Sequence, residues 1–296
     1  MGYELWTSPV TGYRRKGTRL TELRELFDDG ITSRAILEPL QSCPADAPSS
    51  EMIQILRERD FDVAGIKESK DGPFIGFVQR ESLQDGTVRQ HLETLTAEHL
   101  ISESTPLASL LSIFKTRKWT FVLVGAEVKG IITRADLNKP AMRVYLFSLT
   151  SLLEMHMTFW VRHEYPDEGW KERITSERLQ MAQDLLVKRR VRKEQVGLLE
   201  CLQYCDKRDL VVANDKIRNE LGIGSRNKSE SRLRGLESLR DRLAHSQLDL
   251  AEGSSWEKVI ELAEWAEAVI NTSDTRIEEK AGQSALAGQS TLWGAV

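Results

Sequence analysis

An internal repeat constrains the fold of this 296-residue chain more than any other feature of its sequence. The segment 51–66 (EMIQILRERDFDVAGI) aligns with the segment 109–124 (SLLSIFKTRKWTFVLV) at an offset of 58 residues. After a loop that is four residues shorter in the second copy, the segment 76–83 (GFVQRESL) aligns with 130–137 (GIITRADL) at an offset of 54. The pattern predicts a unit of helix, strand, turn, strand and helix that is used twice.

The repeat and its surroundings divide the chain into four predicted parts. An N-terminal arm (1–35) precedes the α+β repeat region (36–140), which is followed by an all-α domain (141–275) and a tail (276–296) that is rich in small and polar residues and expected to be disordered. The helical pattern predicts helices over 142–162, 176–192, 195–205, 215–221, 228–245 and 255–271. Ser255 is expected to cap the last of these helices.

The cysteines exclude several classes of protein. Cys43, Cys201 and Cys205 are odd in number and lack CxxC spacing, which argues against a disulfide framework and against a thiolate metal site. We therefore expect no metal and a cytoplasmic location, and the N-terminus has no pattern of a secretory signal.

One apolar stretch is long enough to raise the question of a membrane span. It covers residues 144–161, but Glu154 and His156 lie in its interior, where lipid would penalise both side chains. We expect a buried or interface helix, and no contact with a membrane.

Basic residues are concentrated in the predicted helical domain. Residues 162–245 contain 19 Lys and Arg against 15 Asp and Glu, and they include the run KRRVRK at 188–193, although the net charge of the chain is −4. Such a region either faces a polyanion such as RNA or is a solvated helix face.

In the second repeat, Thr133 ends a predicted strand and Asp136 follows three residues later. A helix that begins at this point would offer free backbone N–H groups and a positive dipole to a phosphate, and a carboxylate in its first turn could accept two ribose hydroxyls. The alternative is that Thr133 caps the helix and Asp136 complements its dipole without any ligand. The first repeat has Gln79 and Ser82 at these positions, so we expect one competent cleft per chain.

The repeat, with GIITRADL at 130–137 and FVLV at 121–124, resembles a tandem CBS module, a family whose clefts bind adenine nucleotides. The resemblance covers about 100 residues. It implies that Thr133 and Asp136 bind ATP, ADP or AMP as a regulatory ligand. Ser104 and Thr105, just ahead of the helix of the second repeat, are additional candidates for the wall of the cleft.

The segment SLRDRLAHSQ contains Arg240, Asp241 and His245. Histidine is suited to proton transfer near neutral pH and arginine to binding phosphate, which are the requirements for cleaving RNA without a metal. Asp241 and His245 are four residues apart, so on a helix the carboxylate could orient the imidazole. Arg240 and His245 are five apart and need not face one substrate unless the helix ends near Ala244. The alternative is a surface arginine and a histidine that stabilises the end of a helix.

This segment resembles the R-[polar]-x3-H motif of HEPN domains, which are all-helical and include metal-independent ribonucleases. The resemblance implies that Arg240, Asp241 and His245 are catalytic, and that two copies of the motif meet in a homodimer to form a composite site.

Together the two resemblances predict a CBS pair followed by a HEPN-like bundle. The function we expect is a nucleotide-regulated endoribonuclease that leaves 2′,3′-cyclic phosphates, with RNA such as tRNA as its substrate and a role in stress response or antiphage defence. Two alternatives remain open. The chain is a non-catalytic module for adenine-nucleotide sensing and dimerisation, or it is a toxin subunit controlled by a partner enzyme.

Overall fold

The chain divides into two compact units, which we call the α+β unit and the helical unit. The structure, a computed structural model, describes residues 16–28 and 30–292, with side chains up to Lys280. The α+β unit comprises residues 31–139. The helical unit comprises the described residues up to Gly30 together with those from Pro140 onward.

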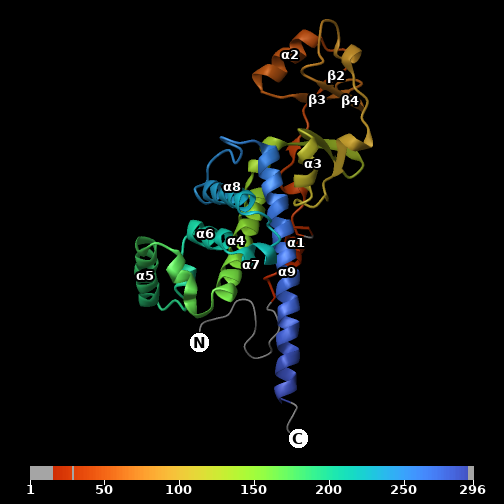
Figure 1. The fold of residues 1–296 in the computed structure, drawn as a ribbon. Coiled ribbons are helices and arrows are strands. Elements are labelled where there is room, and N and C mark those ends of the chain that lie inside the picture. The colour runs from red at the N-terminus through yellow and green to blue at the C-terminus, as the bar shows by residue number, and fades with distance from the viewer. Residues whose placement is uncertain (1–15, 29, 293–296) are drawn as a thin grey trace. The chain divides into compact units, whose positions relative to one another are not determined.

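The α+β unit holds two β-sheets and two α-helices (Figure 1). Its strands are β1 (Glu38–Pro39), β2 (Ser42–Pro44), β3 (Val63–Lys67), β4 (Phe74–Gln79), β5 (Leu100–Ser102), β6 (Trp119–Val124) and β7 (Glu127–Thr133). Its helices are α2 (Ser49–Glu58) and α3 (Leu110–Thr116), with short 3-10 helices η1 (Ser33–Ala35), η2 (Val88–His91), η3 (Ala97–His99) and η4 (Arg134–Asn138).

The two sheets repeat one topology. In the first repeat β2 runs parallel to β3, which pairs with β4 in antiparallel fashion, and α2 connects the parallel strands. In the second repeat β5, α3, β6 and β7 follow the same scheme, and β1 adds an antiparallel edge strand beside β7. The repeat predicted from the sequence is therefore a strand, a helix and an antiparallel strand pair. Each repeat has a short leading strand that the sequence pattern missed.

Strand pairing corrects the alignment of the two repeats. Trp119 lies opposite Thr133, whereas Gln79, which is equivalent to Thr133, lies opposite Val63. Strands β3 and β6 are therefore offset by 56 residues, although the helices α2 and α3 keep the offset of 58. The first repeat thus has two more residues than the second between its helix and β3, in a segment that contains Phe61.

The sequence predicted a helix after the last strand of each repeat, and this prediction is wrong. Residues 134–138 form only the five-residue 3-10 helix η4, and Lys139 is extended (φ −67°, ψ 152°). The reason is Pro140, whose ring disfavours helical geometry in the preceding residue and then starts a new helix itself.

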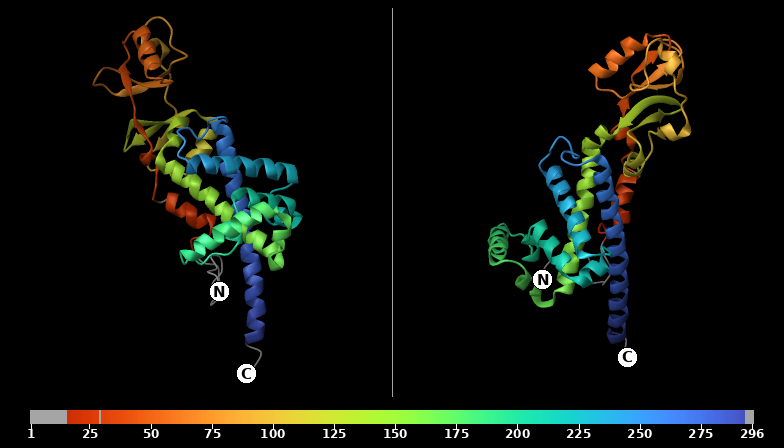
Figure 2. Two further views of the ribbon diagram at one scale, coloured as in Figure 1. Left: turned by 90° about the vertical axis from the view of Figure 1, so that its left-hand side faces the viewer. Right: turned by 45° about the horizontal axis from the view of Figure 1, so that its top comes forward.

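The helical unit contains seven α-helices and two 3-10 helices in the described part of the chain (Figure 2). They are α1 (Leu20–Asp28), α4 (Pro140–Glu164), η5 (Pro166–Arg173), α5 (Ser176–Val191), η6 (Leu199–Cys201), α6 (Tyr204–Ala213), α7 (Asp215–Glu220), α8 (Arg226–Ala244) and α9 (Trp256–Leu292). Because α4 is apolar around most of its circumference, it forms the centre of the unit and packs against α1, α6, α7, α8 and α9.

Several boundaries in the helical unit differ from prediction. The expected helix over 195–205 is replaced by η6 and by α6, which begins at Tyr204, so Cys201 and Cys205 lie in different elements. Helix α1, predicted as an arm that leads into the first domain, belongs to the helical unit because it packs against α4 and α9. Helix α9 extends to Leu292 across most of the segment predicted as a disordered tail. The predicted Ser255 cap is confirmed, since its Oγ accepts a hydrogen bond from Lys258 N–H at 3.3 Å.

Candidate functional site

A cavity of about 640 Å³ opens in the α+β unit. Its walls come from β1 and the loop after it, the segment between α2 and β3, the start of β6, and the end of β7 with η4. Thr133 and Asp136 both line this cavity, and so does Trp119. Its volume is within the range of small-molecule binding sites.

The Asp136 carboxylate is almost buried, with 8% of the residue exposed, and it organises the end of β7. One of its oxygens accepts hydrogen bonds from the backbone N–H and the hydroxyl of Thr133, at 2.7 and 2.9 Å. The other oxygen forms an ion pair with Lys139 at 2.8 Å, and Lys139 also contacts Glu38. Burial lowers the pKa of Lys139, but hydrogen bonds to Asp136 and Glu38 raise it, and the net direction is upward. The Asp136 carboxylate is thus held in place by Thr133 and lies beside the positively charged Lys139.

The α-helix whose dipole was expected to attract a phosphate at Thr133 is not formed. The segment after Thr133 is a five-residue 3-10 helix and not an α-helix, so few peptide dipoles are aligned there. The Thr133 N–H, which the sequence analysis offered to a phosphate, donates to Asp136 instead.

Trp119 supplies an aromatic wall that the sequence analysis left without a role. It pairs with Thr133 across β6 and β7, so the two side chains lie on the same face of the sheet. Its indole stacks on the His99 imidazole with ring centroids 5.7 Å apart and an interplanar angle of 19°, and it meets Phe77 edge-on at 5.2 Å. These contacts hold the ring in place beside the Thr133 hydroxyl.

The corresponding place in the first repeat is filled by the chain itself. The Gln79 side-chain amide donates to both carboxylate oxygens of Glu93, at 3.0 and 3.1 Å, and the Ser82 hydroxyl donates to the Gln79 carbonyl at 2.9 Å. Backbone pairing between Phe77 and Glu93 brings the segment so close that a Cβ at Gly76 would lie 2.4 Å from the Glu93 carbonyl oxygen. The polar side chains of Gln79, Ser82 and Glu93 therefore already form hydrogen bonds within the protein.

Ser104 and Thr105 do not line the cavity with Thr133 and Asp136. Their hydroxyls bond to the neighbouring Ser102, with Ser104 Oγ 2.7 Å from Ser102 Oγ and Thr105 Oγ1 accepting from Ser102 N–H at 3.2 Å. They stabilise the turn that follows β5, which is the ordinary role of hydroxyl residues in turns.

The predicted catalytic residues lie at the C-terminal end of α8. This helix ends at Ala244, so Arg240 lies just before its last turn, Asp241 begins that turn and His245 follows the helix. His245 is exposed, and among the described residues its imidazole has no hydrogen-bond or ion-pair partner. The expected contact between Asp241 and His245 is not made, because the helix ends between them. The Asp241 carboxylate accepts from Arg240 at 3.2 Å instead.

Arg240 is held by a polar cluster that includes Glu154 of α4. Its guanidinium lies 3.5 Å from the Glu154 carboxylate and 6.0 Å from the centre of the Tyr204 ring. Glu154 also pairs with the buried Lys207 ammonium at 2.8 Å. Burial and the nearby Glu154 and Glu237 carboxylates raise the pKa of Tyr204, which stays protonated at neutral pH. No spacing in the sequence links these residues, because they come from α4, α6 and α8.

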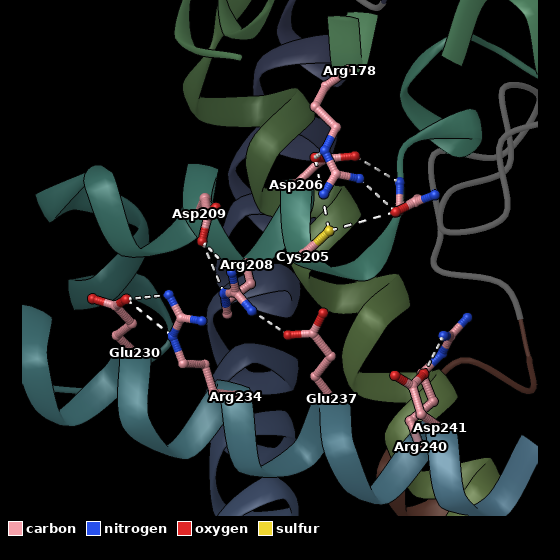
Figure 3. A network of polar contacts seen from close by, with 11 residues as sticks. Arg178, Cys205, Asp206, Arg208, Asp209, Glu230, Arg234, Glu237, Arg240 and Asp241 are labelled. Carbon is pink, nitrogen blue, oxygen red and sulfur yellow. Dashed lines mark hydrogen bonds and ion pairs between the residues drawn. The ribbon is translucent and has the colours of Figure 1, made fainter. Parts of the chain in front are cut away.

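Figure 3 shows further ion pairs of α6 and α8, which are separate from the pair of Arg240 and Asp241. The buried Arg208 binds Glu237 and Asp209, and the more exposed Arg234 pairs with Glu230 at 2.8 Å. Of these ion pairs, the one between Arg208 and Glu237 joins α6 to α8, and the other two lie within a single helix.

His156, the second polar residue within α4, has a structural role. Its Nδ1 lies 2.6 Å from the Ser273 hydroxyl, which also accepts from the Trp160 indole N–H at 2.6 Å. Its Nε2 lies 3.6 Å from the Asp274 carboxylate. These contacts join α4 to α9, and they are distinct from those that Glu154 makes with Arg240.

In the described part of the chain, no group of three or more His, Cys, Asp and Glu side chains has the arrangement of a metal site. Nor does any helix among the described residues combine the length and apolarity needed to cross a bilayer.

No family model matches the chain, and no curated protein matches it. Several solved structures resemble it. The CBS domain of the bacterial CNNM/CorC family Mg2+ transporter is 16% identical with a TM-score of 0.32, and the match covers 43% of this chain and 86% of that chain. CBSX2 in complex with AMP is 14% identical with a TM-score of 0.34, covering 39% and 98%.

A third similar structure contains the CBS domains of a transcriptional regulator from Streptococcus pneumoniae, at 14% identity and a TM-score of 0.32, with 37% of this chain and 98% of that chain covered. Two of these three structures are described as CBS domains.

Proposed function

We propose that the α+β unit is a sensor that binds an adenine nucleotide in the 640 Å³ cavity. The observation that carries this proposal is the convergence of an aromatic ring, a hydroxyl and an anchored carboxylate on one cavity, from Trp119, Thr133 and Asp136. The aromatic ring can stack on a base. The Thr133 oxygen, whose proton is donated to Asp136, and the remaining acceptor position of Asp136 can each accept a hydrogen bond from a ribose hydroxyl.

Calorimetric titration of the full chain with adenosine, AMP, ADP and ATP tests this function, with guanosine and GMP as controls for the base. At least one adenine compound should bind, and at 100 times its Kd it should stabilise the protein by about 2.7 kcal/mol. If none of the adenine compounds binds at millimolar concentration, the sensor function is wrong.

As a second candidate function, we propose that the helical unit is a metal-independent endoribonuclease of the HEPN type. The observation in its favour is that α8 ends at Ala244, which leaves an exposed imidazole at His245 and an anchored guanidinium at Arg240. In this proposal Arg240 binds the scissile phosphate and His245 transfers protons, and a second chain supplies the same pair in a homodimer. Nucleotide binding would then regulate cleavage of RNA.

The nuclease is tested by incubating wild type and His245→Ala with total tRNA and a structured messenger RNA in EDTA, with and without AMP and ATP. Because His245 is exposed, its replacement should leave folding unchanged and abolish cleavage that gives 2′,3′-cyclic ends. Gln247→Ala, at another exposed position, serves as the control. If the two variants cleave equally, Arg240 and His245 are structural, and the chain is a sensing or interaction module.

A further inference from the structure

The charges around the cavity limit the ligand it can accept. The charged residues of its wall are the acidic Glu38, Asp60, Asp62 and Asp136 and the basic Lys118 and Arg134. A wall with more carboxylates than cations is unfavourable for a polyanion, since like charges at short range repel each other.

One of the two wall cations is already committed to the protein. The Arg134 guanidinium donates to the carbonyl oxygen of Phe114 at 2.9 and 3.1 Å, and to that of Arg117 at 2.9 Å. These carbonyls belong to the C-terminal end of α3 and the residue after it, where the helix leaves its last acceptors unpaired. Arg134 therefore caps the C-terminal end of α3. A ligand could bind its guanidinium only by displacing these hydrogen bonds.

Two further cations, Arg80 and Lys139, form ion pairs with carboxylates of the wall. Arg80 pairs with Asp62 at 2.7 Å and with Asp60 at 3.4 Å. Lys139 pairs with Asp136 and with Glu38, as described above. Their positive charge is thus shared out among the acidic groups of the wall.

Lys118 is different. It is exposed, it lies in the cavity wall directly before Trp119, and among the described residues its ammonium has no ion pair or hydrogen bond. Its backbone carbonyl accepts from Arg134 N–H at 3.1 Å, so its position at the start of β6 is fixed while its side chain remains available.

Resting on the proposed sensor function, we propose that the cavity selects a nucleoside monophosphate over the di- and triphosphates, with Lys118 as the cation that binds the single phosphate. A monophosphate carries close to two negative charges, and the Lys118 ammonium neutralises one of them. Each additional phosphate adds charge beside Glu38, Asp60 and Asp62, and no further free cation is present in the described wall.

The first repeat supplies a second aromatic surface to the same cavity. Phe61 lies in the connection between α2 and β3, which is longer than its counterpart in the second repeat, next to Asp60, whose φ of 53° turns the chain at this point. It lines the cavity and remains 38% exposed, unlike the core phenylalanines of this unit. An exposed ring beside a cavity suits a purine base, so Phe61 and Trp119 are the base-contacting residues in this proposal.

The test is calorimetric titration of the full-length protein with adenosine, AMP, ADP and ATP at 0.15 M salt without Mg2+. AMP should bind at least tenfold more tightly than ATP. Lys118→Ala should weaken AMP at least tenfold and change adenosine by less than twofold. Lys70→Ala, which removes an exposed lysine of the same unit outside the cavity wall, should change neither.

A double variant, Asp60→Asn with Asp62→Asn, should bring the affinity for ATP closer to that for AMP, because it removes two carboxylates from the wall. If wild type binds ATP as tightly as AMP, the selectivity is wrong while the sensor function stands. An equal loss of adenosine and AMP in Lys118→Ala would show a structural role for Lys118 and overturn its assignment. Failure of all four compounds to bind would overturn the sensor function itself, and this inference with it.

Discussion

Asp136 and Thr133 are bound to each other twice, since the carboxylate accepts both the backbone N–H and the hydroxyl of Thr133. With Lys139 on the other oxygen, three of the roughly four acceptor positions of the carboxylate are occupied. The expectation that Asp136 accepts two ribose hydroxyls therefore needs correction. One hydroxyl can bind directly, and a second requires Thr133 or Lys139 to move.

We predict that Asp136→Asn weakens binding of the adenine compound that binds most tightly by at least tenfold. The amide has one acceptor oxygen in place of two, so it cannot keep its contacts with Thr133 and Lys139 and also accept a ribose hydroxyl. Calorimetry gives the affinity, and thermal unfolding separates it from a loss of stability. Ser82→Ala, at the equivalent position of the first repeat, should leave the affinity unchanged. If both variants weaken binding equally, the ligand does not distinguish the two repeats.

Gly76→Ala should destabilise the protein by about 1–3 kcal/mol, because its Cβ would overlap the backbone of the neighbouring segment. The new atom would lie 2.4 Å from Glu93 O and 2.9 Å from Leu92 Cδ1. Urea unfolding measures the effect. At Gly169 a Cβ meets nothing within 4 Å, so Gly169→Ala is the control and should leave the unfolding midpoint nearly unchanged. An unchanged midpoint in Gly76→Ala would show that the first repeat is not filled as described.

Removing the partner of a buried cation should be costly. Glu154→Ala leaves the Lys207 ammonium, only 7% exposed, without the carboxylate that lies 2.8 Å away, and we expect a loss of about 3–5 kcal/mol. The matched control is Glu230→Ala, which breaks the exposed pair with Arg234 and should have little effect. Chemical denaturation of both variants measures the two losses of stability. Similar unfolding midpoints would mean that the Lys207 ammonium reaches solvent.

The Cys43 thiol should react slowly. Burial, and next the charge of Glu51, raise its pKa from 9.0 to about 11. At pH 8 its thiolate population is then about 100-fold lower than that of an ordinary cysteine, and alkylation by iodoacetamide should slow accordingly. Peptide mass spectrometry of native and urea-unfolded protein measures the rate, and Glu51→Gln should raise it modestly. Equal rates in the native and unfolded proteins would contradict the prediction.

The same shift makes the stability depend on alkaline pH. The folded protein holds the Cys43 proton more tightly than the unfolded chain, so this contribution is complete below pH 9 and is lost as the pH rises through about 11. Cys43→Ala should flatten the dependence of the unfolding midpoint on pH in this window.

Features that neighbouring residues encode could be predicted from the sequence alone. Helical periodicity and local capping predicted α4, α5, α7 and α8 to within a few residues, and the Ser255 cap of α9. Self-alignment predicted the two repeats, and the difference between Asp136 and Ser82 predicted that they are unequal. Such signals lie within one or two turns of chain, or within a repeated stretch, and need no knowledge of what packs against them.

Features that depend on residues distant in the sequence could be recognised only in the folded chain. Strand pairing places Trp119 opposite Thr133 at the cavity, and the sequence alignment did not predict this pair. The reason is that register is set by hydrogen bonds between strands. Glu93 fills the first repeat, and Glu154 anchors Arg240 from another helix. The energies of these contacts depend on burial and on distances between side chains that are remote in sequence, and periodicity along the chain carries no record of them.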